Sequence, residues 1–169
     1  LLYYGMETGD DATLKAVNKG VDGEQAVEAG RRVTASGMKL SVMVILGIAG
    51  KEGSERHALA TARAINIIKP THLSALCLML YRGSELLDQY EAGKFNPLSP
   101  AGLMQELKLM MENIDIPEDR HCLFRSNHVS NYVQLAATLP KDKSALLRDI
   151  DRSIAHLSKL KSWDVYNYN

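Results

Sequence analysis

The stretch from Lys39 to Gly50 constrains the fold of this chain more than any other part of the sequence. It reads KLSVMVILGIAG, a nearly unbroken run of Val, Ile, Leu and Met that leads directly into a glycine-rich turn. A short apolar run of this kind predicts a strand that is buried on both faces, as parallel strands in α/β proteins are. Ligands of such proteins bind beyond the carboxyl ends of the strands, so we expect the loop of residues 47–53 to border a binding site.

Helix and strand signals alternate along the whole chain. Helical spacing of small and apolar residues follows Ser54, a candidate N-cap, and Pro70 stops that helix. Further strands are predicted at residues 1–5, 72–81 and 121–125. The separation of the first two strands is that of a right-handed crossover, which makes them parallel. After the fourth strand we expect a short helix that reaches Leu139, and then a long last helix after Asp142.

Three further helix starts carry specific capping signals. Asp10 or Asp11 can cap a short helix, and Asp22 with Gln25 three residues later forms a capping-box pair. Ser99 followed by proline places an N-cap directly before the residue type that is favoured at the first helical position. These signals predict helices that begin close to residues 11, 23 and 100.

Repeated strand–helix units with parallel strands indicate either a doubly wound sheet or part of a (β/α)₈ barrel. A complete barrel needs about 250 residues, and four strands in 169 residues amount to half of one. The chain also opens inside a strand without a methionine, so we expect a fragment that lacks an N-terminal part. We predict a partial (β/α) barrel over residues 1–169. Residues 1–95 supply strand–helix units, and residues 96–169 supply helices, a last strand and a C-terminal helix.

Composition excludes several classes of protein. The 20 basic and 20 acidic residues cancel, so no basic field indicates a nucleic-acid partner. No apolar run approaches the roughly 20 residues that a membrane span needs. The sequence shows no charged-then-apolar segment that would indicate secretion, so we expect none. Cys77 and Cys122 lie in separate apolar segments, which predicts reduced core thiols rather than a disulfide or metal ligands. We therefore expect a cytoplasmic protein.

Three motifs in register resemble one enzyme superfamily. They are YGMETGDD from Tyr4, VMVILGIAG from Val42, and PTHLS from Pro70, which continues to GSEL at residues 83–86. In order and spacing they resemble the fourth to sixth strands of radical S-adenosylmethionine (SAM) enzymes, and in particular of the members similar to coproporphyrinogen oxidase and the Elp3-like proteins. The resemblance implies that this chain is the C-terminal half of such a barrel.

The resemblance also implies two cofactors, SAM and a [4Fe–4S] cluster. The family holds its cluster through three cysteines in a C-x3-C-x2-C run, and this chain has neither that run nor the family's Gly-Gly-Glu motif. Because cluster ligation needs several thiolates in one place, the ligands are expected outside this chain. No metal ligand is predicted within it, and the chain is not expected to cleave SAM reductively by itself.

The resemblance assigns five residues to the SAM site. Glu7 is expected to accept hydrogen bonds from the ribose hydroxyls, and Lys19 to face the methionyl carboxylate. Met43 and Ile45 are expected to point toward the adenosine, with the turn at Gly47 letting the backbone approach the adenine. Each has a purely structural alternative. Glu7 and Lys19 also suit helix-dipole interactions, and Met and Ile in a strand are ordinary core residues.

Residues after the fourth strand are the candidates for substrate contact. His128 can move protons near neutral pH and is the predicted catalytic residue, while Asn127 or Arg125 is predicted to hold a polar substrate. The alternative is that Asn127 caps a helix and His128 packs locally. His57, in a predicted helix, is expected to face solvent.

Two functions from different classes remain open at this stage. The first is the C-terminal half of a radical SAM enzyme that acts on an unidentified small molecule. The second is a non-radical α/β enzyme or metabolite-binding module with a glycine-turn site. In either case the strand at residues 1–5 is an unprotected edge, and we expect a concave apolar side with Met43, Ile45 and some of Cys77 or Met79. Self-association or the aromatic tail at residues 163–168 is expected to cover that side.

Overall fold

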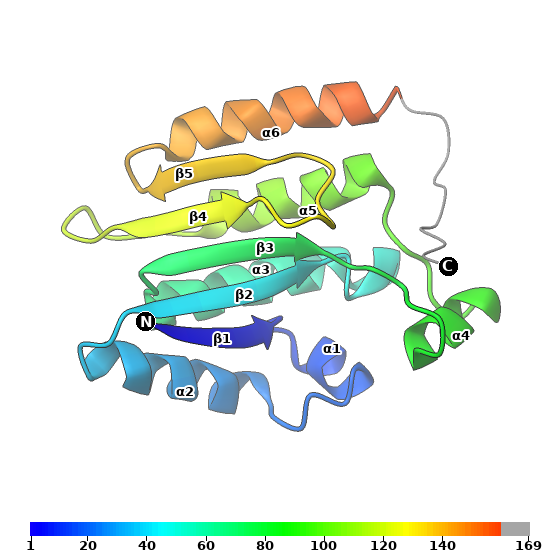
Figure 1. Ribbon diagram of the computed structural model, residues 1–169, viewed down its shortest axis with the longest axis horizontal. Coiled ribbons are helices and arrows are strands. Elements are labelled where there is room, and N and C mark those ends of the chain that lie inside the picture. Colours follow the sequence, from blue (N-terminus) through cyan, green and yellow to red (C-terminus); the bar gives the residue numbers. More distant parts are fainter. Residues whose placement is uncertain (160–169) are drawn as a thin grey trace.

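One five-stranded sheet, covered by helices on one face, forms the framework of the molecule. The computed structural model describes residues 1–159 (Figure 1). The strands follow the order β1-β2-β3-β4-β5 in the sheet. They are β1 Leu2–Glu7, β2 Leu40–Leu46, β3 His72–Cys77, β4 Cys122–Ser126 and β5 Leu135–Leu139. The helices are α1 Asp11–Ala16, α2 Gly23–Ala35, α3 Gly50–Ile68, α4 Glu85–Glu91, α5 Pro100–Asn113 and α6 Lys143–Leu157.

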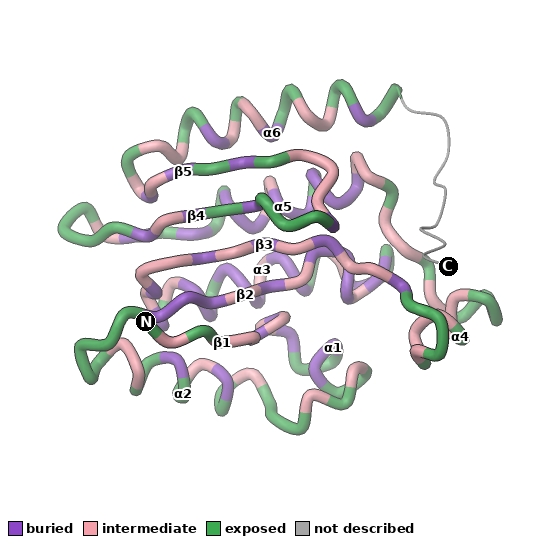
Figure 2. The backbone as a smooth tube through the Cα atoms, in the orientation of Figure 1, coloured by how far each residue is buried: buried purple, intermediate pink, exposed green. Residues whose placement is uncertain are grey.

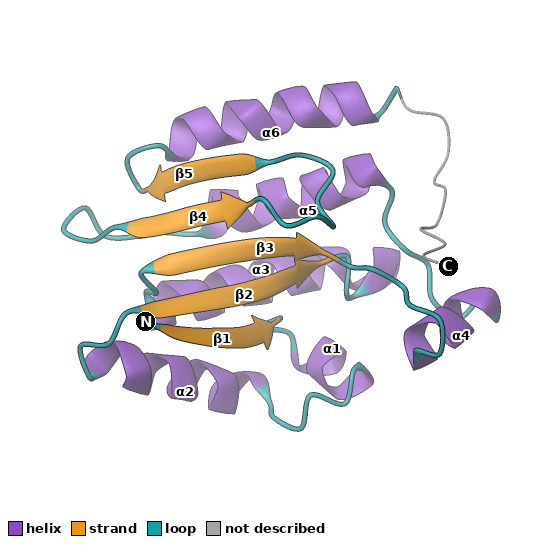
Figure 3. Ribbon diagram, in the orientation of Figure 1, coloured by secondary structure: helices purple, strands orange, loops and turns teal. Residues whose placement is uncertain are grey.

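The strand order identifies a partial barrel. β1 to β4 are parallel, and each lies beside the next strand in the sequence. α3 packs against both α2 and α5, and α5 packs against α6. These helices cover one face of the sheet and leave the other open (Figure 3). A doubly wound sheet carries helices on both faces, so this arrangement is that of a partial (β/α) barrel, and the predicted fold class is confirmed.

β5 corrects the prediction of a short helix ending at Leu139. Residues 135–139 instead pair antiparallel with β4. The side chains of Leu135, Ala137 and Leu139 are buried while Ala136 is exposed, which is the alternation of a half-buried strand. The free edge of β4 supplies backbone partners that outweigh the helical preference of the two alanines. The prediction of four parallel strands is thus confirmed for β1 to β4, and the prediction that a helix follows the fourth strand is wrong.

Three predicted helix starts are confirmed and one is wrong. Asp10 accepts the Thr13 N–H, and Asp22 forms a complete capping box with Gln25. Ser99 caps α5, with proline at its first position. α3, however, begins one turn before Ser54 and has no side-chain cap.

The hydrophobic core lies between the sheet and the helix layer, and it determines which strand positions are buried. Val42, Val44 and Leu46 are fully buried, whereas Met43 and Ile45, which alternate with them, are only half-buried. β2 accordingly carries both buried and intermediate stretches in Figure 2. β2 is therefore buried on one face rather than on both.

The same layering determines whether the two cysteines and Met79 are buried. Cys77 and Cys122 are free thiols in the core, as predicted, and burial raises the pKa of each to about 12. Cys77 therefore does not line the open side, whereas Met79 is half-buried. The predicted aromatic tail at residues 163–168 lies outside the described residues. No helix within residues 1–159 is long and apolar enough to span a membrane.

Candidate functional site

The carboxyl ends of β1 to β4 meet at one edge of the sheet because these strands are parallel. The short helices α1 and α4 and the connections that follow each strand gather at this edge, at the right of Figure 1. The residues predicted for cofactor or substrate contact lie on these strands or just beyond their ends. The exception is Lys19, which follows α1 and reaches the end of β1 through its contact with Glu7.

Glu7 takes a backbone conformation that side chains rarely adopt. Its φ is 65°, and the pairing register between β1 and β2 shifts at this point. The Thr8 N–H donates to the Met6 carbonyl at 2.8 Å, which closes a tight turn around Glu7. Such conformations cost on the order of 1–3 kcal/mol and concentrate at ligand-binding positions. This observation favours a functional role for Glu7 over a simple helix-entry role.

Lys19 pairs with Glu7 at the end of β1. The Lys19 Nζ lies 3.1 Å from the Glu7 Oε1, and the two side chains are 31% and 23% exposed. The carboxylate folds back over Gly5, where an added Cβ would lie 2.5 Å from the Glu7 Oε1. Gly5 is also the register neighbour of Met43. The structure therefore brings Glu7 and Lys19 together, and it places Met43 on the neighbouring strand beside Gly5. The assignment of these residues to SAM stays a prediction.

The glycine turn after β2 is held by close packing against Leu103 and by a hydrogen bond to Glu106. Gly47 has φ 81°, and a Cβ added there would lie 2.7 Å from the Cδ2 of Leu103. Its N–H donates to the Oε1 of Glu106 at 2.7 Å, and the Ser54 hydroxyl donates to the Glu106 Oε2 at 2.5 Å. Helix α5 therefore holds the turn through Glu106, a residue that the sequence interpretation missed.

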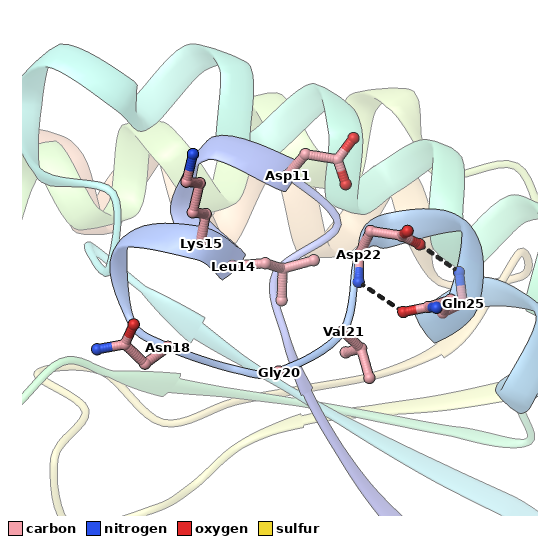
Figure 4. Close-up of a pocket in the computed structure, with 8 residues that line it drawn as sticks. All are labelled: Asp11, Leu14, Lys15, Asn18, Gly20, Val21, Asp22 and Gln25. Carbon is pink, nitrogen blue, oxygen red and sulfur yellow. Dashed lines mark hydrogen bonds between the residues drawn. The ribbon is translucent and has the colours of Figure 1, made fainter.

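A small pocket of about 210 Å³ opens beside this turn. Ile48 from the turn and Leu78 from the end of β3 give it an apolar floor, and Asn18, Glu85 and Gln89 contribute polar groups. A larger open depression of about 510 Å³ lies between α1 and α2 (Figure 4). There Asp22 and Gln25 are already bonded to each other. None of the predicted site residues lines either pocket, but the smaller one borders Ile48, the residue after Gly47.

The substrate candidates lie at the end of β4, two strands away from β2 in the sheet: Arg125 is within β4, and Asn127 and His128 follow it. His128 is exposed, and its Nδ1 accepts the Ser130 N–H at 3.2 Å. A neutral ring therefore carries its proton on Nε2, which faces away from this bond. Asn127 is exposed, while the Nη1 of Arg125 donates to the Phe124 carbonyl at 2.7 Å. These positions suit substrate contact at the same edge, and the individual roles stay predictions.

The loop that carries His128 is fastened to β3 by side chains. Asn131 accepts the Cys77 N–H at 2.9 Å and donates to the Ala75 carbonyl at 2.9 Å, as a neighbouring strand would. The Ser130 hydroxyl accepts the same Cys77 N–H at 3.1 Å. These three hydrogen bonds attach the loop to β3, while His128 itself is exposed.

His57 does not face solvent, which corrects the prediction. It is fully buried, with Nδ1 2.7 Å from the Thr8 Oγ1 and Nε2 3.6 Å from the Glu106 Oε1. Burial lowers the pKa of His57 to about 4. Burial also raises the pKa of Glu106 to about 7, against the opposing hydrogen bonds from Ser54 and Gly47. One sequence signal pointed here: Glu106 lies within the apolar stripe of α5, next to Leu107.

Comparison with known proteins supports the fold. No family model and no curated protein matches the sequence. Among solved structures, the chain is similar to the archaeal Elp3 of Methanocaldococcus infernus with an N-terminal deletion of residues 1–46. The TM-score is 0.64 at 15% sequence identity, and the match covers 92% of this chain and 36% of that chain. The chain thus shares the fold of about a third of an Elp3, which is one of the groups that its motifs resemble.

Proposed function

We propose that this chain is the C-terminal half of a radical SAM barrel and contributes part of the SAM site and part of the substrate site. The observation that carries the proposal is the strained Glu7, paired with Lys19 at the carboxyl edge of a parallel sheet. The fold shared with an archaeal Elp3 supports it. Residues 1–95 supply the SAM-binding units, and the later residues supply the substrate side.

The polar and apolar side chains at this edge fit the chemical groups of SAM. Glu7 offers an acceptor for ribose hydroxyls, and Lys19 offers a cation for the methionyl carboxylate. Ile48 and Leu78 provide an apolar surface for the adenine beside the glycine turn, where Met43 and Ile45 line the open face. The Glu7–Lys19 pair is partly exposed, and such pairs contribute only about 0–1 kcal/mol to stability. Breaking the Glu7–Lys19 ion pair, so that each side chain can contact the ligand instead, therefore costs little free energy. When bound and cleaved by a reduced cluster, SAM supplies radical chemistry.

The described residues do not fit a [4Fe–4S] cluster. Residues 1–159 contain no group of three His, Cys, Asp or Glu side chains arranged to hold a metal. The two thiols are buried and protonated at neutral pH, since burial raises their pKa to about 12. We propose that a preceding half of the barrel supplies the cluster.

We expect Glu7→Ala to weaken SAM binding by roughly 10- to 100-fold, because a hydrogen bond to a charged group contributes about 1.5–3 kcal/mol. The measurement is calorimetric titration with SAM of the protein that contains both barrel halves. Glu118→Ala is the matched control: it removes an exposed carboxylate from the connection that enters β4, at the other edge of the sheet. Equal SAM affinity of a folded Glu7→Ala variant and the unchanged protein would remove Glu7 from the site.

The missing half can be tested separately. We expect the chain alone to hold no stoichiometric iron and sulfide after anaerobic reconstitution, and the coding sequence upstream of Leu1 to contain the C-x3-C-x2-C run. A stoichiometric cluster on this chain, or an upstream sequence without the three cysteines, contradicts the proposal. Either result would favour the alternative, a non-radical metabolite-binding α/β module.

A further inference from the structure

A buried polar network connects the turn after β2 to the turn after β1, behind the proposed ligand site. At one end the Gly47 N–H donates to Glu106, whose Oε1 lies 3.6 Å from the Nε2 of His57. At the other end the Nδ1 of His57 lies 2.7 Å from the Thr8 Oγ1, which accepts the Asp10 N–H at 3.0 Å. Elements far apart in the sequence are thus connected through two titratable side chains.

The network has room for one additional proton. Within the described residues, the Nε2 of His57 is the buried side-chain nitrogen or oxygen without a hydrogen-bond partner. The distance of 3.6 Å to Glu106 is too long for a normal hydrogen bond. With Glu106 ionised, the neutral ring carries its proton on Nε2 and accepts the Thr8 O–H at Nδ1. When the carboxyl is protonated and moves slightly closer to the ring, its O–H can donate to Nε2, and Nδ1–H then donates to Thr8.

We propose that Glu106 is a positioning residue for the ligand-binding glycine turn, which it holds through the Gly47 N–H, and that His57 accepts a hydrogen bond from Glu106 when the carboxyl is protonated. A hydrogen bond to an ionised carboxylate is roughly twice as strong as one to a neutral group. The turn is therefore held most firmly when Glu106 is charged. The link to SAM affinity rests on the function proposed above, whereas the link to the turn itself does not.

The groups that face the pair are few, so a titration of the turn can be assigned. Glu106 on α5 meets Ser54 and His57 from α3, and Cys77 from β3 interacts with it electrostatically. His57 additionally feels the charge of Asp10, which is bonded to Arg56 at 2.7 Å. Cys77 stays protonated across the neutral range because burial raises its pKa to about 12. Glu106 is therefore the group expected to change charge near neutral pH, where burial places its pKa at about 7.

The test follows the Gly47 amide by NMR between pH 5 and 9 on the isotope-labelled chain. We expect its resonance to titrate with a midpoint near 7, matching that of the Glu106 carboxyl carbon. In Glu106→Gln the titration of Gly47 should disappear. In Glu112→Gln, which removes an exposed carboxylate from the same helix, it should persist. Because the carboxyl carbon is measured in the unchanged chain, the test stands even if Glu106→Gln does not fold.

A Gly47 amide that does not titrate, or that titrates unchanged in Glu106→Gln, overturns the proposal. The ligand experiment separates it from the proposed function. In protein that contains both barrel halves, we expect SAM affinity to be roughly 3- to 10-fold higher at pH 8 than at pH 6, and this ratio to approach one in Glu106→Gln. No SAM binding at any pH would contradict the proposed function and leave the Gly47 titration as an independent result.

Discussion

At the scale of single residues, Glu7 combines an unfavourable backbone conformation with a charge that the proposed site needs. A left-handed conformation costs a residue with a side chain roughly 1–2 kcal/mol relative to glycine. We expect Glu7→Gly to be more stable than Glu7→Ala by about 1 kcal/mol, because both remove the carboxylate and glycine alone relieves the backbone. Urea denaturation measures the difference. At Glu118, whose φ is not positive, glycine should instead be no better than alanine.

Glu106 and His57 make opposite contributions to stability as pH changes. Burial raises the pKa of Glu106 from 4.5 to about 7, so the folded state binds the extra proton and its stability falls as pH rises through that window. Burial lowers the pKa of His57 from 6.5 to about 4, so the unfolded state binds the extra proton and stability rises with pH between 4 and 6.5. The two slopes oppose each other between about pH 4.5 and 6.5.

Each single substitution should therefore leave only the other residue's contribution to the pH dependence of stability. We expect Glu106→Gln to gain stability with rising pH between about 4 and 6.5, and His57→Gln to lose stability between about 4.5 and 7. Each change is on the order of 2–3 kcal/mol. Denaturant titrations at a series of pH values measure it, with exposed His156→Gln as the control for His57. Parallel pH profiles for all variants would show that the buried pair does not titrate as described.

At the scale of elements, the turn between β2 and α3 depends on glycine for two separable reasons. Gly37 and Gly47 both have φ 81°, but only at Gly47 would a Cβ meet a neighbour, the Cδ2 of Leu103 at 2.7 Å. Gly37→Ala should cost about 1–2 kcal/mol for the backbone alone. Gly47→Ala should cost a further 1–3 kcal/mol, roughly, for overpacking. An equal loss of stability in both variants, measured by thermal or urea unfolding, would show that the turn at Gly47 accommodates the added methyl group without strain.

Periodicity predicted most elements but not the buried polar contacts between them. The apolar runs from residues 39 and 72 and the caps Asp10, Asp22 and Ser99 are local signals, and the structure contains them, although the strand predicted over residues 72–81 ends at Cys77. β5 was missed because its pairing depends on the free edge of β4. Glu106 was missed because its partner, the Gly47 N–H, lies 59 positions away in the sequence. The roles of Glu7 and Lys19 come from family resemblance and stay predictions, whereas the turn at Gly47 was indicated by the apolar run that precedes it.

At the scale of the whole molecule, the open face and the free edge of β1 belong to the same region. Tyr3 on β1 is 69% exposed, and the half-buried Met43 and Ile45 continue its face on β2. Unpaired backbone groups beside apolar side chains favour association with another sheet. A symmetric pair of chains can hide both features at once.

We therefore expect the isolated chain to self-associate, as judged by light scattering over a concentration series. Tyr3→Lys should shift the equilibrium toward monomer, because it places a charge on the open face next to the edge. Tyr81→Lys is the matched control. Tyr81 is 54% exposed beyond the end of β3, and this variant should associate like the unchanged chain. A stable monodisperse monomer would contradict self-association.

The reversed direction of β5 has a practical consequence for measuring this protein. Because β5 runs against β4, the connection between β5 and α6 lies at the opposite edge from the candidate ligand site. Lys141 in that connection is exposed, and both native thiols are buried with pKa values near 12. A single cysteine placed at position 141 would thus be the reactive thiol of residues 1–159. A fluorophore or a sensor surface attached there would leave the ligand edge unobstructed.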